Sequence, residues 1–470
     1  MEVRVDKKEP LQAFFAPHHI GVIGASNKEG KMGNLFVRRL LARFPGKISL
    51  VHPKDQEIMG VPTYPDINAI PETLDLVIPL IPQEQLLALL RTCQRGKVKF
   101  LLAIPSGFGE VPGVGKPLEM ELIRLAKERD IRVVGPNSMG MLNCLYGLNA
   151  SMVPEQPPGG AGFSCITQSG GYGMAIYMYA QNHQLQMAKI CDLGNTSDVQ
   201  VHELLHYFRN DSDTQIVGLF LESVPDKEAF LVQAKALAAQ KPLIFTKLGR
   251  TKAGGRASFA HLGLVPDWLG TQEMNGANKI IQAQTGLEML HIAKALSWQP
   301  LPRGRKVGII TGSGGVGTEL ADFCVEHGLE VPEFSPQLQE ALRSYLPSYA
   351  SVSNPVDLTP IWWEFPKVYP PLIQTIFSSN EVDLLIVTII DVATTIQDLM
   401  YAVIEANSHP QRNILSAKPL YIYWASPYDQ LKNMRILEES RIPCYQSTLE
   451  TARVAAAICN YAMQKAEEGI

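Results

Sequence analysis

The sequence HHIGVIGASNKEGKMGN at residues 18–34 decides the fold class, because it joins a short apolar run to a glycine-rich turn and an amphipathic stretch. The apolar run at 20–24 predicts a buried strand, and the glycines allow a sharp turn into a helix. The same succession returns at CITQSGGYG (165–173) and at VGIITGSGGVG (307–317). Strands and helices that alternate in this way form parallel sheets with crossover helices. The sequence therefore predicts an α/β protein made of three doubly wound units.

Working outward from these turns, short β-branched runs mark the other predicted strands. In the first unit they lie at 48–51, 74–80, 99–104 and 131–134. In the second unit they lie at 163–167, 187–192, 215–222 and 242–247, with helices from 171, near 199–208, at 226–239 and at 275–296. In the third unit they lie at 307–311, 383–390 and 419–424, with a helix through 325 and another at 449–468.

Two proline- and glycine-rich stretches separate the three units. VPEQPPGGAG (153–162) and WQPLPRGRK (298–306) are typical of linkers. A chain of 470 residues also has the length of about three domains at roughly 150 residues each. We therefore expect domains at 1–150, 151–298 and 299–470.

The composition excludes several classes of protein. Lys and Arg number 42 against 46 Asp and Glu, and the net charge of −4 gives no basic surface for nucleic acid or an anionic membrane. The chain has no apolar run of about 18 residues, and its N-terminus lacks the apolar core of a secretory signal. The seven cysteines are scattered without a CxxC pair, which favours reduced thiols. We expect a cytoplasmic protein that binds neither nucleic acid nor a membrane.

The first glycine turn could hold a phosphate group. Gly24 bends the chain, and the amides of Ala25, Ser26 and Asn27 follow, where an anion could dock at a helix N-terminus. The spacing departs from G-x-G-x-x-G, and Lys54 stands where a dinucleotide-binding fold has an acid. A cation there suits a nucleotide with an extra ribose phosphate, such as coenzyme A or NADP. The alternative is a tight turn that serves packing alone.

The second turn, Ser169-Gly170-Gly171, lies between a buried strand and the start of a helix. Several amide N–H groups would converge there, and the helix dipole favours a phosphoryl group. An ordinary N-cap at Ser169 would explain the serine but not the paired glycines. The third turn, at 311–315, has the same form, and packing explains it equally well.

A basic loop of the second unit carries one histidine. Residues 247–256 contain four cations interleaved with glycines, and His261 follows. An imidazole can accept a phosphoryl group when one ring nitrogen is free and a carboxylate or carbonyl holds the other. Glu222 ends a strand at the edge where this loop begins, so it is a candidate for that carboxylate. The alternative is a solvated surface loop in which His261 is incidental.

The segment HELLH at 202–206 fits the H-E-x-x-H pattern of zinc proteases. On a helix, the apolar residues at 201, 204, 205 and 208 form one stripe, and the two histidines lie on the opposite face toward solvent. No clear third ligand follows. We therefore expect surface histidines and no metal site.

In combination, these motifs resemble the α subunit of the ADP-forming (NDP-forming) acyl-CoA synthetases, relatives of succinyl-CoA synthetase. The resemblance runs from about residue 12 to the C-terminus. It rests on ten short motifs in order: IGVIGAS (20–26), HPK (52–54), IPSGF (104–108), GPNSMG (135–140), TQSGGYG (167–173), LGNTSDV (193–199), LFLES (219–223), KLGRTKAGGRASFAH (247–261), TGSGGVG (311–317) and NPVDL (354–358).

The resemblance implies an N-terminal Rossmann-like CoA-binding domain followed by two flavodoxin-like doubly wound domains. It implies that His261 carries a phosphoryl group and that Glu222 orients its ring. The residues that would receive the phosphoryl group are Ser169, Gly170 and Gly171. The residues that would bind coenzyme A are Gly24, Ala25, Ser26, Asn27, Lys54, Ser106 and Asn137.

The reaction implied by the resemblance is acid + CoA + ATP ⇌ acyl-CoA + ADP + phosphate, through an acyl phosphate and a phosphohistidine. Its substrates are a small carboxylic acid and coenzyme A. We find no segment that would form the nucleotide-binding ATP-grasp module. The resemblance therefore implies a hetero-oligomer with a separate ATP-grasp β subunit, on which ATP or ADP binds with Mg²⁺.

The flanks of His261 depart from the family pattern. Ala260 and Leu262 stand where the family usually has serine and threonine, and Pro266 and Trp268 replace small residues further along. The change removes two hydroxyls that could hydrogen-bond the phosphoryl group or the loop. One alternative function is therefore a catalytically decayed protein that binds CoA or acyl-CoA as a sensor or scaffold. A NADP-linked reductase is another.

Overall fold

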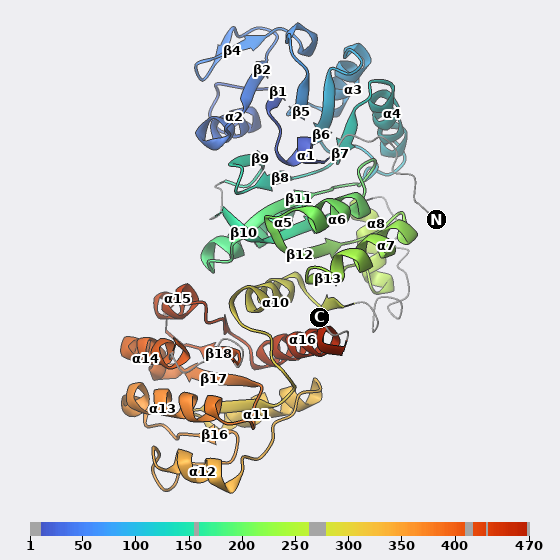
Figure 1. Cartoon of the computed structure of the whole chain (residues 1–470). Helices are drawn as coiled ribbons and strands as arrows, with labels where there is room; N and C mark the ends of the chain where they lie inside the picture. Colours follow the sequence, from blue (N-terminus) through green and yellow to red (C-terminus); the bar gives the residue numbers. More distant parts are fainter. Residues whose placement is uncertain (1–10, 155–158, 263–278, 409–416, 429–430, 468–470) are drawn as a thin grey trace. The chain divides into compact units, whose positions relative to one another are not determined.

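The computed structural model describes residues 11–154, 159–262, 279–408, 417–428 and 431–467. The chain divides into two units, Met1–Gly286 and Leu287–Ile470. The first unit contains two seven-stranded sheets and the second contains one five-stranded sheet, each flanked by helices (Figure 1). Most strand pairs are parallel, which confirms the predicted α/β class with three doubly wound sheets.

The first sheet has the strand order β3-β4-β2-β1-β5-β6-β7. Its strands are β1 (His19–Ile23), β2 (Lys47–Val51), β3 (Glu57–Ile58), β4 (Val61–Tyr64), β5 (Leu74–Pro79), β6 (Val98–Leu102) and β7 (Arg132–Val134). Its helices are α1 (Gln12–Phe15), α2 (Met32–Arg43), the short η1 (Ile67–Ala69), α3 (Gln83–Thr92) and α4 (Gly115–Glu128). Figure 1 shows α2 on one side of this sheet and α3 and α4 on the other. The strand order therefore reverses between β1 and β5, where such folds bind ligands.

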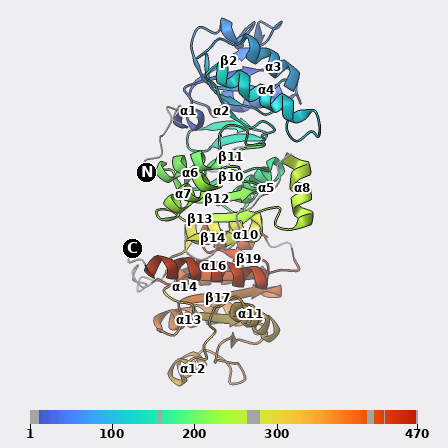
Figure 2. The same cartoon turned by 90° about the vertical axis from the view of Figure 1, so that its right-hand side faces the viewer.

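The second sheet has the order β14-β13-β12-β10-β11-β8-β9. Its strands are β8 (Gly140–Asn143), β9 (Leu148–Ser151), β10 (Gly159–Thr167), β11 (Met187–Asp192), β12 (Thr214–Leu221), β13 (Leu243–Lys247) and β14 (Ile280–Ala283). Its helices are α5 (Gly170–Asn182), α6 (Val201–Asn210), α7 (Lys227–Ala238) and α8 (Lys252–Leu262). Figure 2 shows α6 and α7 on one side of the sheet and α5 and α8 on the other.

The third sheet has the order β16-β15-β17-β18-β19. Its strands are β15 (Val307–Thr311), β16 (Val356–Asp357), β17 (Leu384–Ile390), β18 (Leu420–Ala425) and β19 (Cys444–Tyr445). The helices around it are α10 (Gly286–Trp298), α11 (Gly314–Glu326), α12 (Pro336–Arg343), η2 (Trp362–Glu364), α13 (Phe365–Ser378), η3 (Asp391–Thr395), α14 (Gln397–Ser408), α15 (Leu431–Glu439) and α16 (Thr448–Glu467).

The first two sheets share one hydrophobic core through the short helix α1. The ring of Phe14 lies 5.6 Å from that of Phe100 in the first sheet, measured between centroids. The adjacent Phe15 ring lies 5.5 Å from Phe208 on α6 of the second sheet. Both α1 rings are fully buried, and one cluster of apolar side chains runs through both sheets. This packing fixes the first α/β domain to the sheet that carries Glu222.

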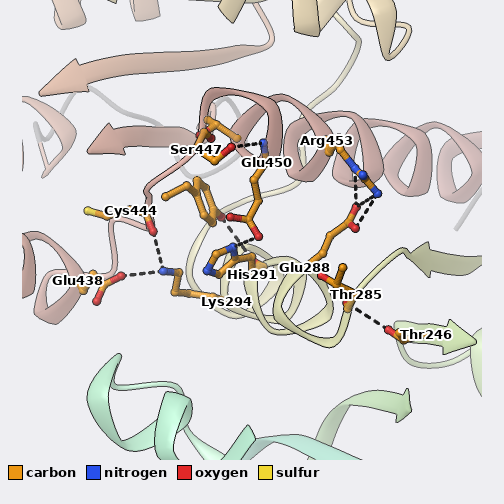
Figure 3. Close-up of polar contacts among 12 residues, drawn as sticks. Thr246, Thr285, Glu288, His291, Lys294, Glu438, Cys444, Ser447, Glu450 and Arg453 are labelled. Atoms are coloured by element: carbon orange, nitrogen blue, oxygen red, sulfur yellow. Dashed lines mark hydrogen bonds and ion pairs between the residues drawn. The ribbon is translucent and has the colours of Figure 1, made fainter. Parts of the chain in front are cut away.

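Helix α10 belongs to the second unit, to which charged side chains attach it (Figure 3). The Lys294 ammonium donates to Glu438 at 2.7 Å and to the Cys444 carbonyl at 2.8 Å, and neither charged side chain is exposed to solvent. The Arg453 guanidinium binds both carboxylate oxygens of Glu288. Buried charges of this kind are tolerated because each is paired and hydrogen-bonded.

Several predicted elements were wrong or missing. The helix expected at 275–296 is instead the edge strand β14 followed by α10, while residues 275–278 lie outside the described part. The β-branched residues Ile280 and Ile281 pair with β13 at the sheet edge, and a helix begins only at Gly286. The antiparallel hairpin β8–β9 was not predicted, and β10 already begins inside the stretch taken as the first linker.

Candidate active site

The carboxyl ends of three neighbouring strands meet at one edge of the second sheet. Strand β10 lies between β11 and β12, and Thr167 at its end pairs with Asp192 on one side and Phe220 on the other. The chain continues from these strand ends into the Ser169 turn and into Glu222. Parallel strands therefore bring residues far apart in the sequence to one place.

His261 and Glu222 form a close pair at this edge. His261 lies on α8, and its Nδ1 is 2.8 Å from Oε1 of Glu222. The Glu222 side chain is 7% exposed, whereas the His261 side chain is 49% exposed. Within the described residues, Nε2 of the ring has no hydrogen-bond partner. The hydrogen bond that the ring donates to Glu222 raises the pKa of His261, and the charges of Glu222, Asp192 and Glu110 raise this pKa further.

Two residues that sequence reasoning missed hold Glu222 in place. The Ser258 hydroxyl donates to Oε2 of Glu222 at 2.6 Å, so each carboxylate oxygen has its own partner. The Gln168 side-chain oxygen accepts the backbone N–H groups of Glu222 and Ser223 at 2.8 and 3.0 Å, and its amide donates to Thr196. Ser258 lies three residues before His261, which is a spacing that shares one helix face and was a usable signal.

The predicted phosphate-binding turn lies at the start of α5. Ser169 is the residue before the helix, and its hydroxyl makes no capping hydrogen bond, so the ordinary N-cap explanation does not hold. The Ser169 amide instead donates to the Thr167 hydroxyl at 2.9 Å. A Cβ on Gly171 would meet no atom within 4 Å, while one on Gly170 would lie 3.1 Å from Met139. The turn therefore has open space beside Gly171, whereas the Met139 side chain fills the space beside Gly170.

The first glycine turn borders a groove of about 870 Å³ at the carboxyl end of β1. Gly24, Ala25 and Ser26 line it, together with Lys31, a cation that sequence reasoning did not single out. Gly24 has φ +84°, and its carbonyl oxygen would lie only 2.0 Å from a Cβ on Gly33. The turn and the first residues of α2 thus approach as closely as two glycines allow.

Two other predicted CoA-binding residues do not line this groove. The Asn27 side chain accepts the Met59 amide at 3.0 Å and donates to the Glu57 carbonyl at 3.2 Å, so it holds the neighbouring loop. Lys54 is exposed beside the lining residues His52 and Pro53.

Ser106 and Asn137 lie at a different place, beside the second sheet. The backbone N–H of Asn137 donates to the Pro105 carbonyl at 3.0 Å. The side-chain nitrogen of Asn137 lies 3.4 Å from the side-chain oxygen of Asn195. Asn195 in turn donates to Glu110 at 2.7 Å. Because the Glu110 charge also acts on His261, this loop lies on the side of the molecule where the histidine is.

The third glycine turn repeats the second in detail. The Ser313 amide donates to the Thr311 hydroxyl at 3.0 Å, just as the Ser169 amide donates to Thr167. A Cβ on Gly314 would lie 2.9 Å from a carboxylate oxygen of Asp357. The two turns, which lie in different units, therefore share the same local hydrogen bond before a helix.

The HELLH segment forms part of α6, and its apolar stripe is buried as predicted. Of the two histidines expected at the surface, His206 is exposed, whereas His202 is half-buried. Glu203 accepts hydrogen bonds from the Arg132 guanidinium and from the backbone N–H of Gln200. These donors occupy the Glu203 carboxylate. Among the described residues, no group of three potential ligands could hold a metal ion.

Three further predictions concern the cysteines, membrane-spanning helices and the flank of His261. All seven cysteines are buried, and none of them forms a disulfide. In the part of the chain that the structure describes, no helix has both the length and the apolar character needed to cross a membrane. Gly263, Pro266 and Trp268, on the altered flank of the histidine, lie outside the described residues.

Comparison with known families assigns most of the chain to three family domains. A CoA binding domain model matches residues 18–143, a succinyl-CoA ligase like flavodoxin domain model matches 159–296, and a ligase-CoA domain model matches 307–468. The chain is 30% identical to the acetate–CoA ligase [ADP-forming] II subunit alpha of Pyrococcus furiosus, over 96% of this chain and 98% of that protein. The chain belongs to the ADP-forming acyl-CoA ligase α subunits.

Two further relatives place this α subunit in the family. The acetate–CoA ligase [ADP-forming] of Methanocaldococcus jannaschii is 35% identical over 74% of this chain, which spans about half (49%) of that protein. Among solved structures, an acetyl-coenzyme A synthetase 1 of Ca. Korarchaeum cryptofilum, in complex with phosphate and ADP, matches with a TM-score of 0.84 and 27% identity. That match covers 97% of both chains.

Proposed function

We propose that this ligase α subunit transfers a phosphoryl group through His261, with Glu222 orienting the ring. The observation that carries the proposal is the 2.8 Å contact between Nδ1 of His261 and the buried Glu222 carboxylate. The carboxylate holds one ring nitrogen, and the half-exposed ring presents the other. This is the arrangement that a nucleophilic imidazole requires.

The chemistry follows from this arrangement. In the neutral ring, Nδ1–H donates a hydrogen bond to the Glu222 carboxylate. The lone pair on Nε2 is then free to attack the phosphorus of an acyl phosphate. The N–P bond forms as the P–O bond to the acid breaks, and the carboxylic acid leaves as its anion. Glu222 stabilises the positive charge that develops on the ring. The phosphohistidine then passes its phosphoryl group to ADP, and every step runs in reverse for acyl-CoA synthesis.

Ser169, Gly170 and Gly171 would bind the phosphoryl group during this transfer. The N-terminus of α5 carries a partial positive charge and amide N–H groups that lack partners within the helix. The open space beside Gly171 supports access by an anion.

Coenzyme A would bind in the groove beside Gly24, Ala25 and Ser26. A cation at Lys31 and the exposed Lys54 would meet its phosphates, while Asn27 would act indirectly by holding the loop. Ser106 and Asn137 would lie near the reacting thiol end, since their loop is on the histidine side.

We propose a separate ATP-grasp β subunit as the partner that binds ATP or ADP with Mg²⁺. Two supports for this partner are the name of the Pyrococcus relative, which is a subunit alpha, and the M. jannaschii relative, which is about twice as long. The acid substrate is a small carboxylic acid. Acetate is named for several relatives, and 4-hydroxybutyrate for another at 26% identity. The boundaries of the three domains and a cytoplasmic location stay predictions.

The alternative functions have less support. The named relatives are ligases, and none of them favours a catalytically decayed CoA sensor. The match to a CoA binding domain at residues 18–143 favours coenzyme A over NADP.

Phosphorylation of the purified complex tests the proposal. The chain is co-expressed with a β subunit, supplied with Mg²⁺ and labelled ATP, and examined for acid-labile phosphate. We expect label on the wild-type α subunit and none on His261→Ala. The matched control is His206→Ala, an exposed histidine that should leave the label unchanged. Label that persists in His261→Ala, or a complex that never takes up label, contradicts the proposal.

A further inference from the structure

Asp192 is a fully buried carboxyl group at the end of β11 that the mechanism above does not use. The Met139 amide donates to its Oδ2 at 2.6 Å, and the Gly194 amide donates to its Oδ1 at 3.3 Å. Each oxygen therefore has one backbone donor and retains a further lone pair. No lysine or arginine is among its hydrogen-bond or ion-pair partners in the described residues.

The carboxyl group of Asp192 lies against the start of α5. A Cβ on Gly170 would be 3.5 Å from Oδ2 of Asp192 and 3.1 Å from the Met139 side chain. Gly170 is the first residue of the helix whose N-terminus would bind the phosphoryl group. A buried carboxylate would thus lie close to the place where a phosphoryl dianion binds.

The titratable groups around Asp192 come from α8, from strands β10 and β11, and from the end of β12. His261 on α8 favours the ionised carboxyl group, and Glu222 after β12 disfavours it. The thiols of Cys165 and Cys191 are buried nearby, and their pKa values are raised by burial and by the Asp192 charge. Burial dominates for Asp192 itself and raises its pKa to about 7.

We propose that Asp192 couples phosphoryl binding at the N-terminus of α5 to the uptake of one proton. The inference rests on the proposed function, because it concerns the same anion site. Two anions side by side in a buried place repel each other, and the simplest relief is protonation of one. The proton comes from solvent and binds the Asp192 carboxylate, so no bond to phosphorus changes. The neutral carboxyl group can then donate a hydrogen bond to the phosphoryl oxygen.

The consequence is an anion affinity that depends on pH with a defined sign. Above the pKa of Asp192, each unit of pH weakens binding by up to about tenfold, because a proton must be taken up for each anion bound. Deprotonation of His261 also weakens anion binding as pH rises. The test therefore uses His261→Gln, whose side chain carries no charge at any pH.

The experiment measures sulfate binding to the full-length chain by calorimetry between about pH 5.5 and 8.5. Sulfate keeps its two charges over this range, whereas phosphate itself titrates near neutral pH. Affinity is compared for His261→Gln and for His261→Gln/Asp192→Asn. Asparagine matches aspartate in size and stays neutral. Repeating each titration in buffers of different ionisation enthalpy counts the protons taken up.

We expect sulfate affinity of His261→Gln to fall with rising pH, with about one proton taken up near pH 8. The added Asp192→Asn change should abolish both the pH dependence and the proton uptake. Equal pH dependence in the two proteins overturns the proposal. Binding must also disappear in Gly171→Glu, which places a carboxylate in the open space, but survive in Gly171→Ala.

Sulfate binding that survives Gly171→Glu lies elsewhere and also overturns the proposal. The outcome is distinguishable from a failure of the proposed function, because the histidine is absent from both proteins compared. Whether His261 carries phosphate is decided by the labelling experiment alone.

Discussion

At the scale of single residues, the charge of Glu222 sets when His261 can act as a nucleophile. A raised pKa means that the ring is protonated, and therefore inert, up to a higher pH than an ordinary histidine. Nucleophilic attack needs the neutral ring, so the rate of phosphorylation should rise with pH through this pKa.

Glu222→Gln should move that rise to lower pH. Glutamine removes the negative charge that raises the pKa of His261, and the value then returns toward 6.5. Loss of a charge-assisted hydrogen bond, about 1.5–3 kcal/mol, should also slow labelling at high pH about ten- to a hundredfold. The measurement is the rate of acid-labile labelling against pH. Glu228→Gln, an exposed residue with the same charge change, is the control, and an unshifted profile in Glu222→Gln would refute the orienting role.

Asp192→Asn should change how stability depends on pH. The pKa of Asp192 is raised from 3.8 to about 7, so the folded protein binds a proton that the unfolded chain releases. Stability from this group is complete below about pH 4 and is lost as pH rises through 7, by up to about 4 kcal/mol. Asparagine removes that loss. Urea unfolding at pH 5 and pH 8 should therefore show the variant gaining on the wild type at the higher pH; a constant difference would contradict the buried neutral carboxyl group.

At the scale of elements, the glycines of the turns differ in what they tolerate. Gly33→Ala should destabilise the first sheet by at least about 2 kcal/mol, because its Cβ would press on the Gly24 carbonyl. Gly315→Ala on α11 meets no atom within 4 Å and should stabilise the second unit by about 0.5–1 kcal/mol through helix propensity. Denaturant unfolding measures both, and equal effects would show that backbone approach is not the constraint.

Lys294→Met tests the attachment of α10. The substitution leaves Glu438 buried without its ammonium partner, which should cost about 3–5 kcal/mol in unfolding free energy. Adding Glu438→Gln removes the uncompensated charge, so the double variant should recover much of that loss. Thermal unfolding checks both variants, and a double variant less stable than Lys294→Met would rule out the ion pair as the cause.

The regular elements were predictable where one residue type dominates a segment. Val22 and Ile23, like Ile309 and Ile310, stand in short β-branched strands before glycine turns, and these strands were found as predicted. The edge strand β14 was not, because its residues become a strand only by pairing with β13, which lies over thirty residues earlier. A local sequence pattern does not indicate which distant strand a segment pairs with.

The residues of the candidate active site also fall into those that the sequence could predict and those that it could not. Glu222 and His261 could be named because each follows a strand or a basic loop of recognisable type. Gln168 and Asp192 could not, because their importance depends on the order of β11, β10 and β12 in the sheet. Asn27 was predicted as a ligand-binding residue, but its side chain supports the neighbouring loop.

At the scale of the whole molecule, the chain passes from one unit to the next just before α10. The structure assigns residues from Leu287 onward to the second unit. Glu288, His291 and Lys294 pair with α16 and α15 of that unit. Helix α10 is therefore part of its core.

Two truncated chains test this assignment. A fragment of residues 287–470 should fold and unfold cooperatively, whereas a fragment of 299–470 should melt roughly 10 °C lower or fail to fold. The shorter fragment leaves Glu438, Glu450 and Arg453 without their partners on α10. Differential scanning calorimetry of the two fragments gives the answer, and similar melting temperatures would show that α10 is dispensable to the second unit.

The two phenylalanines of the four-residue helix α1 have a consequence for communication within the first unit. Because Phe14 and Phe15 insert their rings into both sheets, neither sheet can open to solvent without disturbing the other. Occupation of the groove at Gly24 should therefore slow deuterium uptake along β10 and β12, although those strands never meet the nucleotide. Binding of a ligand to the first domain would therefore reduce how often the sheet that positions His261 opens locally.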